Sequence, residues 1–232
     1  MQYNKIFKKF ILLTFIISTA TIIFNGCNED TNITPPTVTQ PVIMVTHASP
    51  NTPNIDIYIG NTKVSSNVSY PFSTPYNTGS VGNDRVRVNI ANSSNSAIDT
   101  SFYCEEGKSY SVFAIDSLSK ITPLVLTDVL TVPGTGNSNV RFINLSPNGP
   151  DVDLYVAAVN SFPNIAFKEV YDFRALAAGT YTLQVKLAKQ PVVIFTLPNV
   201  TFSSGKIYTV YLKGFAGGSG TQALGLGIIN NN

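Results

Sequence analysis

Residues 49–59 read SPNTPNIDIYI, and residues 146–156 read SPNGPDVDLYV, nearly the same sequence 97 positions further along the chain. At the same offset, Gly82 has its counterpart in Gly179. GKSYSVF at 107–113 recurs as GKIYTVY at 205–211, with one residue of slippage. A register held over so much of the chain indicates an internal duplication. Each copy has about 92 residues, which suffices for one modest hydrophobic core.

Within each copy, apolar residues alternate with polar ones, as they do in strands that bury one face. Ile55, Ile57 and Ile59 alternate with Asp56 and Tyr58. The expected strands are 42–47, 55–59, 67–72, 85–90, 98–104, 109–115 and 123–130, then 139–145, 152–156, 165–171, 181–187, 192–197, 207–213 and 221–229. About seven short strands per copy, separated by Pro, Gly and Asn, predict an all-β fold of two tandem immunoglobulin- or transthyretin-like antiparallel β-sandwiches. An open barrel is the alternative.

The N-terminus reads as a targeting segment. Lys5, Lys8 and Lys9 precede an uncharged stretch over 10–24, a pattern typical of a secretory signal and too short for a spanning helix. The following Phe-Asn-Gly-Cys resembles a bacterial lipoprotein signal, in which a small residue precedes a cysteine that becomes acylated. We therefore predict lipidation at Cys27. An ordinary signal peptide in which Cys27 is incidental is the alternative.

The expected organisation follows from these two features. Residues 1–26 form the signal peptide, and 27–40, rich in Thr and Pro, form the lipidated cysteine and a flexible tether. Residues 41–132 form the first sandwich, 133–138 a linker and 139–232 the second sandwich. The expected location is the bacterial cell envelope, as an outer-membrane-anchored lipoprotein that is periplasmic or surface-exposed.

Composition narrows the class of partner. Charged residues make up 12% of the 232, about half the usual share of a soluble domain. The formal net charge of +2 includes three lysines within 1–26, so the processed chain is close to neutral. A nucleic-acid-binding protein needs a concentrated basic face, and this chain has none to offer. The expected partners are a membrane, through the lipid, and a glycan or an envelope protein.

His47 and Cys104 are residue types that often take part in catalysis, but the sequence favours a structural role for both. His47 is the only histidine, so a Ser-His-Asp triad would need it together with an Asp such as Asp56. No Gly-x-Ser-x-Gly motif is present, and the counterpart of His47 is Asn144, so we expect a histidine that ends the first strand and hydrogen-bonds at the turn. Cys104 lies beside two glutamates, which disfavour a thiolate, and we expect a small buried apolar residue.

Asp56 and Asp153 are the remaining candidates for chemistry. With Asn51 and Asn54, or in the second copy with nearby Asn and Asp residues, they supply oxygen ligands of the kind that Ca²⁺ prefers. The spacing lacks the D-x-D-x-D-G run of a known calcium loop. We therefore favour turns in which the aspartates bind nearby amides, and predict no metal and no cofactor. The tyrosines, which include Tyr58 and Tyr155, either flank the core or stack on sugars.

Two stretches together resemble a known family. The stretch V-T-H-A-S-P-N over 45–51, continuing into I-D-I-Y-I, and the later G-K-x-Y-S-V over 107–112 are similar to the bacterial domain-of-unknown-function family 4397. The resemblance covers both copies, about residues 42–229. It implies secreted or envelope-anchored bacterial proteins with tandem β domains, and it brings no activity and no catalytic residues.

Two functions remain open at this point. The favoured one is a non-catalytic binding or structural module, anchored to the membrane, that holds a glycan, an envelope protein or an adhesion partner. The alternative is a secreted hydrolase with a carboxylate-based site. The 13 acidic residues are scattered along the chain, which disfavours the hydrolase.

Overall fold

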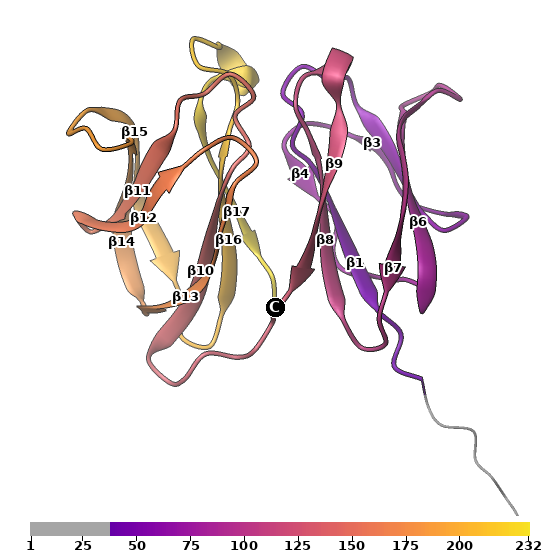
Figure 1. Ribbon diagram of the computed structural model, residues 1–232, viewed down its shortest axis with the longest axis horizontal. Coiled ribbons are helices and arrows are strands. Elements are labelled where there is room, and N and C mark those ends of the chain that lie inside the picture. The colour runs from indigo at the N-terminus through magenta and orange to yellow at the C-terminus, as the bar shows by residue number, and fades with distance from the viewer. Residues whose placement is uncertain (1–37) are drawn as a thin grey trace, which may run out of the picture. The chain divides into compact units, whose positions relative to one another are not determined.

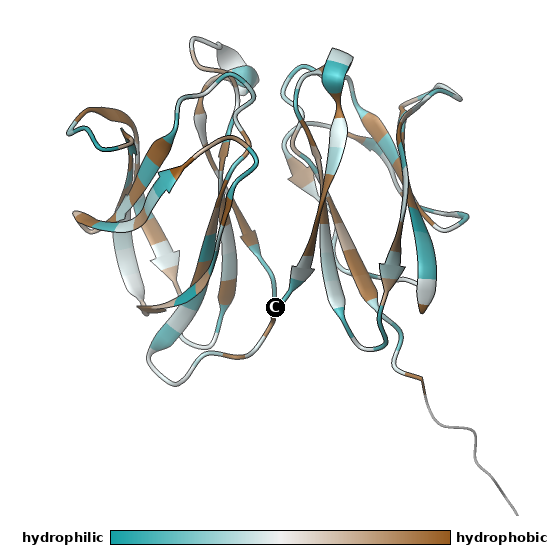
Figure 2. Cartoon of the chain, viewed as in Figure 1, coloured by the Kyte–Doolittle hydropathy of each residue, from teal (hydrophilic) through white to brown (hydrophobic). Residues whose placement is uncertain are grey.

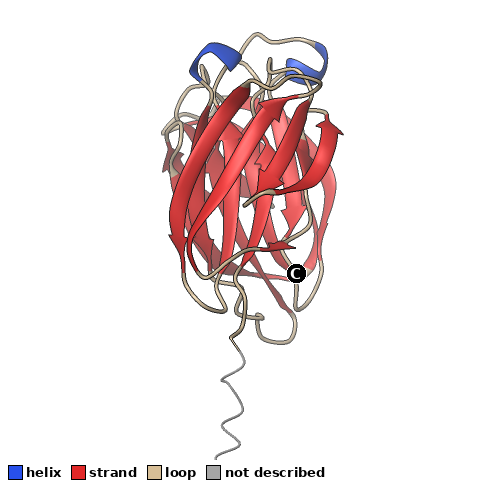
Figure 3. Ribbon diagram, turned by 90° about the vertical axis from the view of Figure 1, so that its right-hand side faces the viewer, coloured by secondary structure: helices blue, strands red, loops and turns tan. Residues whose placement is uncertain are grey.

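The structure is a computed structural model that describes residues 38–232, so Cys27 and the predicted signal peptide lie outside the described residues. Strands dominate this part of the chain, with two short 3-10 helices at the loops (Figures 1 and 3). The predicted all-β sandwich fold is confirmed. Among residues 38–232, the structure has no helix with the length and apolar character needed to cross a membrane.

The first repeat contains β1 to β9 in two sheets. The sheet β3-β2-β6-β7 is the first outer sheet. The sheet β4-β1-β8-β9, with β5 also paired to β1, is the first inner sheet because it faces the second repeat (Figure 1). The bounds are β1 Val42–His47, β2 Ile55–Ile59, β3 Thr62–Val68, β4 Phe72–Ser73, β5 Asn77–Thr78, β6 Gly82–Ile90, β7 Ser96–Cys104, β8 Ser109–Ile115, η1 Leu118–Lys120 and β9 Thr122–Asp128.

The second repeat contains β10 to β17 with the same topology. Its outer sheet is β12-β11-β14-β15, and its inner sheet is β13-β10-β16-β17, where the continuous β13 replaces the interrupted β4 and β5. The bounds are β10 Asn137–Asn144, β11 Val152–Val156, β12 Val159–Ile165, β13 Val170–Ala177, β14 Gly179–Leu187, β15 Val193–Phe202, β16 Ile207–Lys213, η2 Gly220–Gln222 and β17 Gly225–Asn230.

The structure differs from the sequence prediction in the direction of one strand pair in each repeat and in the bounds of several strands. One pair in each sandwich is parallel, β1 with β8 and β10 with β16, so the sandwiches are not purely antiparallel. The expected strands 67–72 and 165–171 are wrong. In the structure β3 and β12 end at Val68 and Ile165, and in each repeat the chain then turns into the inner sheet. The edge strand β3 reads TKVSSNV and is largely exposed, so it lacks the apolar alternation by which a half-buried strand is recognised.

Each repeat has its own hydrophobic core between its two sheets. Ile43, Ile57, Val88 and Val112 are among the fully buried residues of the first core. The second core includes Phe142, Leu154 and Phe202 among its buried residues. In Figure 2 brown segments alternate with white and teal ones along the strands, as expected where one face of a strand packs between two sheets.

A third apolar cluster lies between the repeats, where the sequence pattern predicts none. The strands β1, β8, β10 and β16 are buried on both faces over most of their lengths. Residues of one parity face their own core, while Met44, Phe113, Ile143 and Tyr211 pack between the two inner sheets. The two inner sheets therefore meet face to face, and the molecule is a stack of four sheets over residues 38–232 (Figure 1).

A buried polar network crosses this inter-repeat interface. The Asp128 carboxylate at the end of β9 pairs with the Arg141 guanidinium of β10, with Oδ1 2.6 Å from Nη1. Its Oδ2 accepts hydrogen bonds from Ser111 Oγ and Tyr76 Oη, both at 2.6 Å. Burial, with the Asp128 carboxylate beside it, raises the pKa of Tyr76, so this hydroxyl stays protonated and donates. Both partners of the ion pair are buried.

The network is built from equivalent positions of the two repeats. Arg141 Nε donates to Thr209 Oγ1 at 2.7 Å, and Thr209 in turn donates to Asn231 Oδ1 at 2.8 Å. The counterparts across the duplication are Met44 and Arg141, Tyr76 and Phe173, Ser111 and Thr209, Phe113 and Tyr211, and Asp128 and Asn231. Equivalent faces therefore meet, as in an isologous dimer, but a single charge pair makes the two sides different.

Candidate functional site

The repeated Ser-Pro-Asn motif fastens two loops together in each repeat. Ser49 Oγ donates to the carbonyl of Asp116 at 2.5 Å, and the Leu118 amide donates to Asn51 Oδ1 at 2.8 Å. In the second repeat Ser146 Oγ donates to the Gly214 carbonyl at 2.7 Å, and the Ala216 amide donates to Asn148 Oδ1 at 2.9 Å. The motif thus joins the loop after the first strand of each repeat to the loop some 67 residues later. Its recurrence has a structural cause.

His47 occupies the structural position that the sequence predicted. It is fully buried at the end of β1, and its Nε2 donates to the Pro53 carbonyl at 3.2 Å. This bond leaves Nδ1 as the unprotonated nitrogen. Burial lowers the pKa of His47 from 6.5 to about 4, so the ring is neutral at neutral pH. In the second repeat Asn144 Nδ2 donates to the Pro150 carbonyl, also at 3.2 Å, which explains how an amide replaces an imidazole.

Asp56 and Asp153 hold backbone amides, as the favoured interpretation predicted. Asp56 Oδ1 accepts from the amide of Asn67 at 2.9 Å, and Asp153 Oδ1 accepts from that of Asn164 at 2.6 Å. Both asparagines have a left-handed backbone, with φ of 54° and 53°, and the aspartates stabilise these turns. The second oxygen of Asp56 accepts from Lys63 Nζ at 2.7 Å. No group of three or more potential metal-ligating side chains occurs within residues 38–232.

Cys104 is a core residue of the first sandwich. Its side chain is fully buried at the end of β7. Burial, with a smaller contribution from the Asp84 carboxylate, raises the pKa of the Cys104 thiol to about 11. Such a thiol is protonated at physiological pH and is a poor nucleophile. The predicted structural role is therefore the one that the structure supports.

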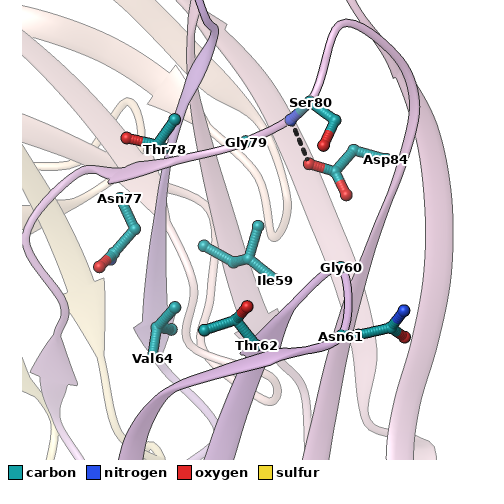
Figure 4. Close-up of a pocket in the computed structure, with 10 residues that line it drawn as sticks. All are labelled: Ile59, Gly60, Asn61, Thr62, Val64, Asn77, Thr78, Gly79, Ser80 and Asp84. Carbon is teal, nitrogen blue, oxygen red and sulfur yellow. Dashed lines mark hydrogen bonds between the residues drawn. The ribbon is translucent and has the colours of Figure 1, made fainter.

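A pocket that sequence reasoning missed opens in the first repeat, between edge strands β3 and β5 (Figure 4). Its volume is about 340 Å³, at the small end of ligand-binding cavities. Its lining consists of Ile59, Gly60, Asn61, Thr62, Val64, Asn77, Thr78, Gly79, Ser80 and Asp84. Asp84 Oδ2 accepts a hydrogen bond from the Ser80 amide at 2.8 Å, which holds segment 77–80 at one side of the pocket (Figure 4).

The second repeat has larger side chains at two of the equivalent positions. Leu176 and Tyr181 stand where the first repeat has Gly79 and Asp84, and both pack against the second core. The Tyr181 hydroxyl donates to the carbonyl of Ala177 at 2.7 Å. A Cβ on Gly79 would lie 2.8 Å from Asp84 Oδ2, so a larger residue there would displace the carboxylate. The two repeats therefore have different residues at the pocket positions, whereas both have the Ser-Pro-Asn motif that joins their loops.

A second pocket, of different chemistry, lies on the outer sheet of the second repeat. It has a volume of about 420 Å³, and Asp153, Tyr155, Asn160, Lys186 and Lys189 are among the residues that line it. Lys186 Nζ lies 3.8 Å from the centroid of the Tyr155 ring, which is a close cation–π contact.

In the first repeat the counterpart of Tyr155 is Tyr58, and it is covered from two directions. The Arg87 guanidinium lies 4.4 Å from the Tyr58 ring centroid, and Lys63 Nζ lies 5.3 Å from it. These two pockets therefore lie at different places on their sandwiches.

The fold and these sites define a tandem-repeat β-sandwich protein, and comparison with known proteins identifies the family. The model of the family described as "Domain of unknown function (DUF4397)" matches residues 41–155 and 138–232. The chain therefore belongs to this family, and the match covers both repeats. A comparison with curated proteins finds no match.

Proposed function

We propose that this protein is a non-catalytic binding module of the bacterial cell envelope, held on the membrane by a lipid on Cys27. The observation that carries the binding part is the divergence of the two repeats at their pockets. The first repeat has an open polar pocket at positions where the second has Leu176 and Tyr181, which pack against its core, although the Ser-Pro-Asn motif is present in both. The titratable residues of the repeated motifs are engaged in hydrogen bonds that hold turns, which leaves them little freedom for proton transfer.

The anchor part rests on the sequence. A basic start, an uncharged stretch over 10–24 and Gly26-Cys27 support export and acylation, and the Thr- and Pro-rich stretch after them supports a tether. More than one acyl chain would hold the protein durably, because each buried CH₂ contributes about 0.8 kcal/mol. The partner that we propose is a glycan or another envelope protein.

Membrane fractionation tests the anchor. The Cys27→Ser variant should move from the membrane pellet to the soluble fraction and should lose incorporation of labelled palmitate. Cys104→Ser is the matched control, since Cys104 is the only other cysteine and is buried. A Cys27→Ser protein that still sediments with membranes would show that the anchor assignment is wrong.

A glycan array followed by product analysis tests the binding role. The purified protein should retain one class of glycan, or co-purify with one envelope protein from cross-linked intact cells, and leave the bound glycan uncleaved. Release of shortened glycan by the wild type would instead establish a hydrolase.

A further inference from the structure

Asp84 is a carboxylate on the core-facing side of a strand. In β6 it has the same parity as Val86 and Val88, which are fully buried in the first core, and Asp84 itself is 4% exposed. The equivalent strand of the second repeat carries Tyr181 at this position, followed by two buried apolar residues at the same parity. A buried charge is costly unless it is compensated, and this carboxylate lies at the wall of a pocket.

Two cations of the same sheet are paired with other carboxylates. Arg85 follows Asp84 in the strand, points to the opposite face and forms a bidentate ion pair with Asp99. Lys63 pairs with Asp56 on the same outer face. Within residues 38–232, Asp84 takes part in no ion pair and accepts only the amides of Ser80 and Arg85.

The pocket in front of Asp84 is otherwise neutral and rich in oxygen. Asp84 carries the only formal charge among the ten lining residues, so the pocket attracts a cation and repels an anion. Hydroxyl groups come from Thr62, Thr78 and Ser80, and Ile59 and Val64 supply apolar surface. Figure 4 shows the Ile59 side chain between the two segments that border the pocket.

We propose that this pocket binds a small ligand that carries a primary ammonium group on a short hydroxylated body, the chemistry of an amino sugar or an amino alcohol. The ammonium pairs with the Asp84 carboxylate, the ligand hydroxyls bond to the Thr and Ser hydroxyls, and its C–H surface packs on Ile59 and Val64. The inference names the ligand class for one site of the proposed binding function, and it rests on that function.

The lining favours this class over two others. A tightly held divalent metal takes several carboxylates among its oxygen ligands, and the pocket offers a single one. A neutral sugar would bury Asp84 without neutralising it, whereas an ammonium supplies both charge and donors. The volume of about 340 Å³ accommodates a ligand of monosaccharide size.

The test is a titration of the purified full-length protein with glucosamine at pH 6, in which the methyl NMR signals of Ile59 and Val64 report binding. Glucose and N-acetylglucosamine are the matched ligands, because they keep the ring and lack the charged amine. We expect saturable shifts with glucosamine and an affinity at least about tenfold weaker for the two neutral sugars, the loss expected for one charge-assisted hydrogen bond.

Two variants locate the site. Asp84→Asn keeps the shape of the side chain and should weaken glucosamine binding at least about tenfold, whereas Asp99→Asn, on the opposite face of the same sheet, should leave it unchanged. Thr62→Val copies the second repeat and should weaken binding severalfold; it serves if Asp84→Asn does not fold.

Three outcomes would overturn the inference: no saturable shift with glucosamine, equal affinity for N-acetylglucosamine, or Asp84-dependent binding of Ca²⁺ in place of the amine. Failure here is distinguishable from failure of the proposed function. Retention on a glycan array that Asp84→Asn does not alter would uphold a binding module and reject this ligand class.

Discussion

The ion pair between Asp128 and Arg141 offers the sharpest test of how the two repeats are joined. We predict that Arg141→Met, which copies the counterpart Met44, lowers the free energy of unfolding by about 3–5 kcal/mol. The variant removes hydrogen bonds to Asp128, Thr209 and Ser111 at 2.6, 2.7 and 3.1 Å, and it leaves a buried carboxylate without a cation. The lost hydrogen bonds contribute about 1 kcal/mol each to this cost. The single variant therefore does not separate their loss from the effect of the uncompensated Asp128 charge.

A second substitution, at Asp128, separates the loss of hydrogen bonds from the effect of the uncompensated buried charge. Asp128→Asn copies the counterpart Asn231, and its amide oxygen can still accept from Ser111 and Tyr76. In the double variant Asp128→Asn/Arg141→Met no charge is left buried, so the cost relative to the wild type should fall to about 1–2 kcal/mol. The double variant is therefore expected to be more stable than Arg141→Met alone, by about 2 kcal/mol.

Urea denaturation of the four proteins, followed by circular dichroism, measures these free energies. The repeats should unfold in one transition in the wild type, because the apolar cluster between the inner sheets links them. A cost below about 1 kcal/mol for Arg141→Met, or simple additivity in the double variant, would refute the reasoning that an uncompensated charge dominates. Two separate transitions in the wild type would refute the coupling of the repeats.

Three further predictions concern residues that the sequence singled out. The folded pKa of His47, about 4, lies below its unfolded value of 6.5, so its contribution to stability is complete above pH 6.5 and is lost as the pH falls towards 4, by about 3 kcal/mol in total. The difference between wild type and His47→Asn in urea midpoints across pH 4–7 measures this, and a constant difference would contradict it. Cys104 should resist a thiol reagent at pH 8 until urea unfolds the protein, and rapid labelling of the folded chain would contradict its burial. EDTA should leave the melting temperature unchanged, and a drop of several degrees would point to an ion at Asp56 or Asp153.

Much of the fold follows from the printed sequence, because repetition and alternation are visible there. The duplication and the alternation at Ile55, Ile57 and Ile59 predict two sandwiches with separate cores, and the structure confirms both. The Ser-Pro-Asn turns and the aspartate bonds to amides were predicted because such residues favour local hydrogen bonds.

The interface between the repeats and the pocket could not be predicted in the same way. A strand buried on both faces, such as β8 with SYSVFAI, carries no alternation that tells the core side from the interface side. Arg141 reads as a surface residue until its partner Asp128 is known to lie across the interface. Asp84 did break the apolar alternation of its strand, and comparison with Tyr181 at the same offset was the available signal.

The face-to-face packing of equivalent sheets has a consequence for how the protein behaves when it is scarce. A lone repeat would expose Phe113 or Tyr211 and their neighbours to water. It could bury them only by associating with another molecule, so its stability would fall on dilution. Covalent fusion replaces that encounter by an intramolecular one at a high effective concentration. A chain that carries its own complementary half stays assembled however few copies a cell produces.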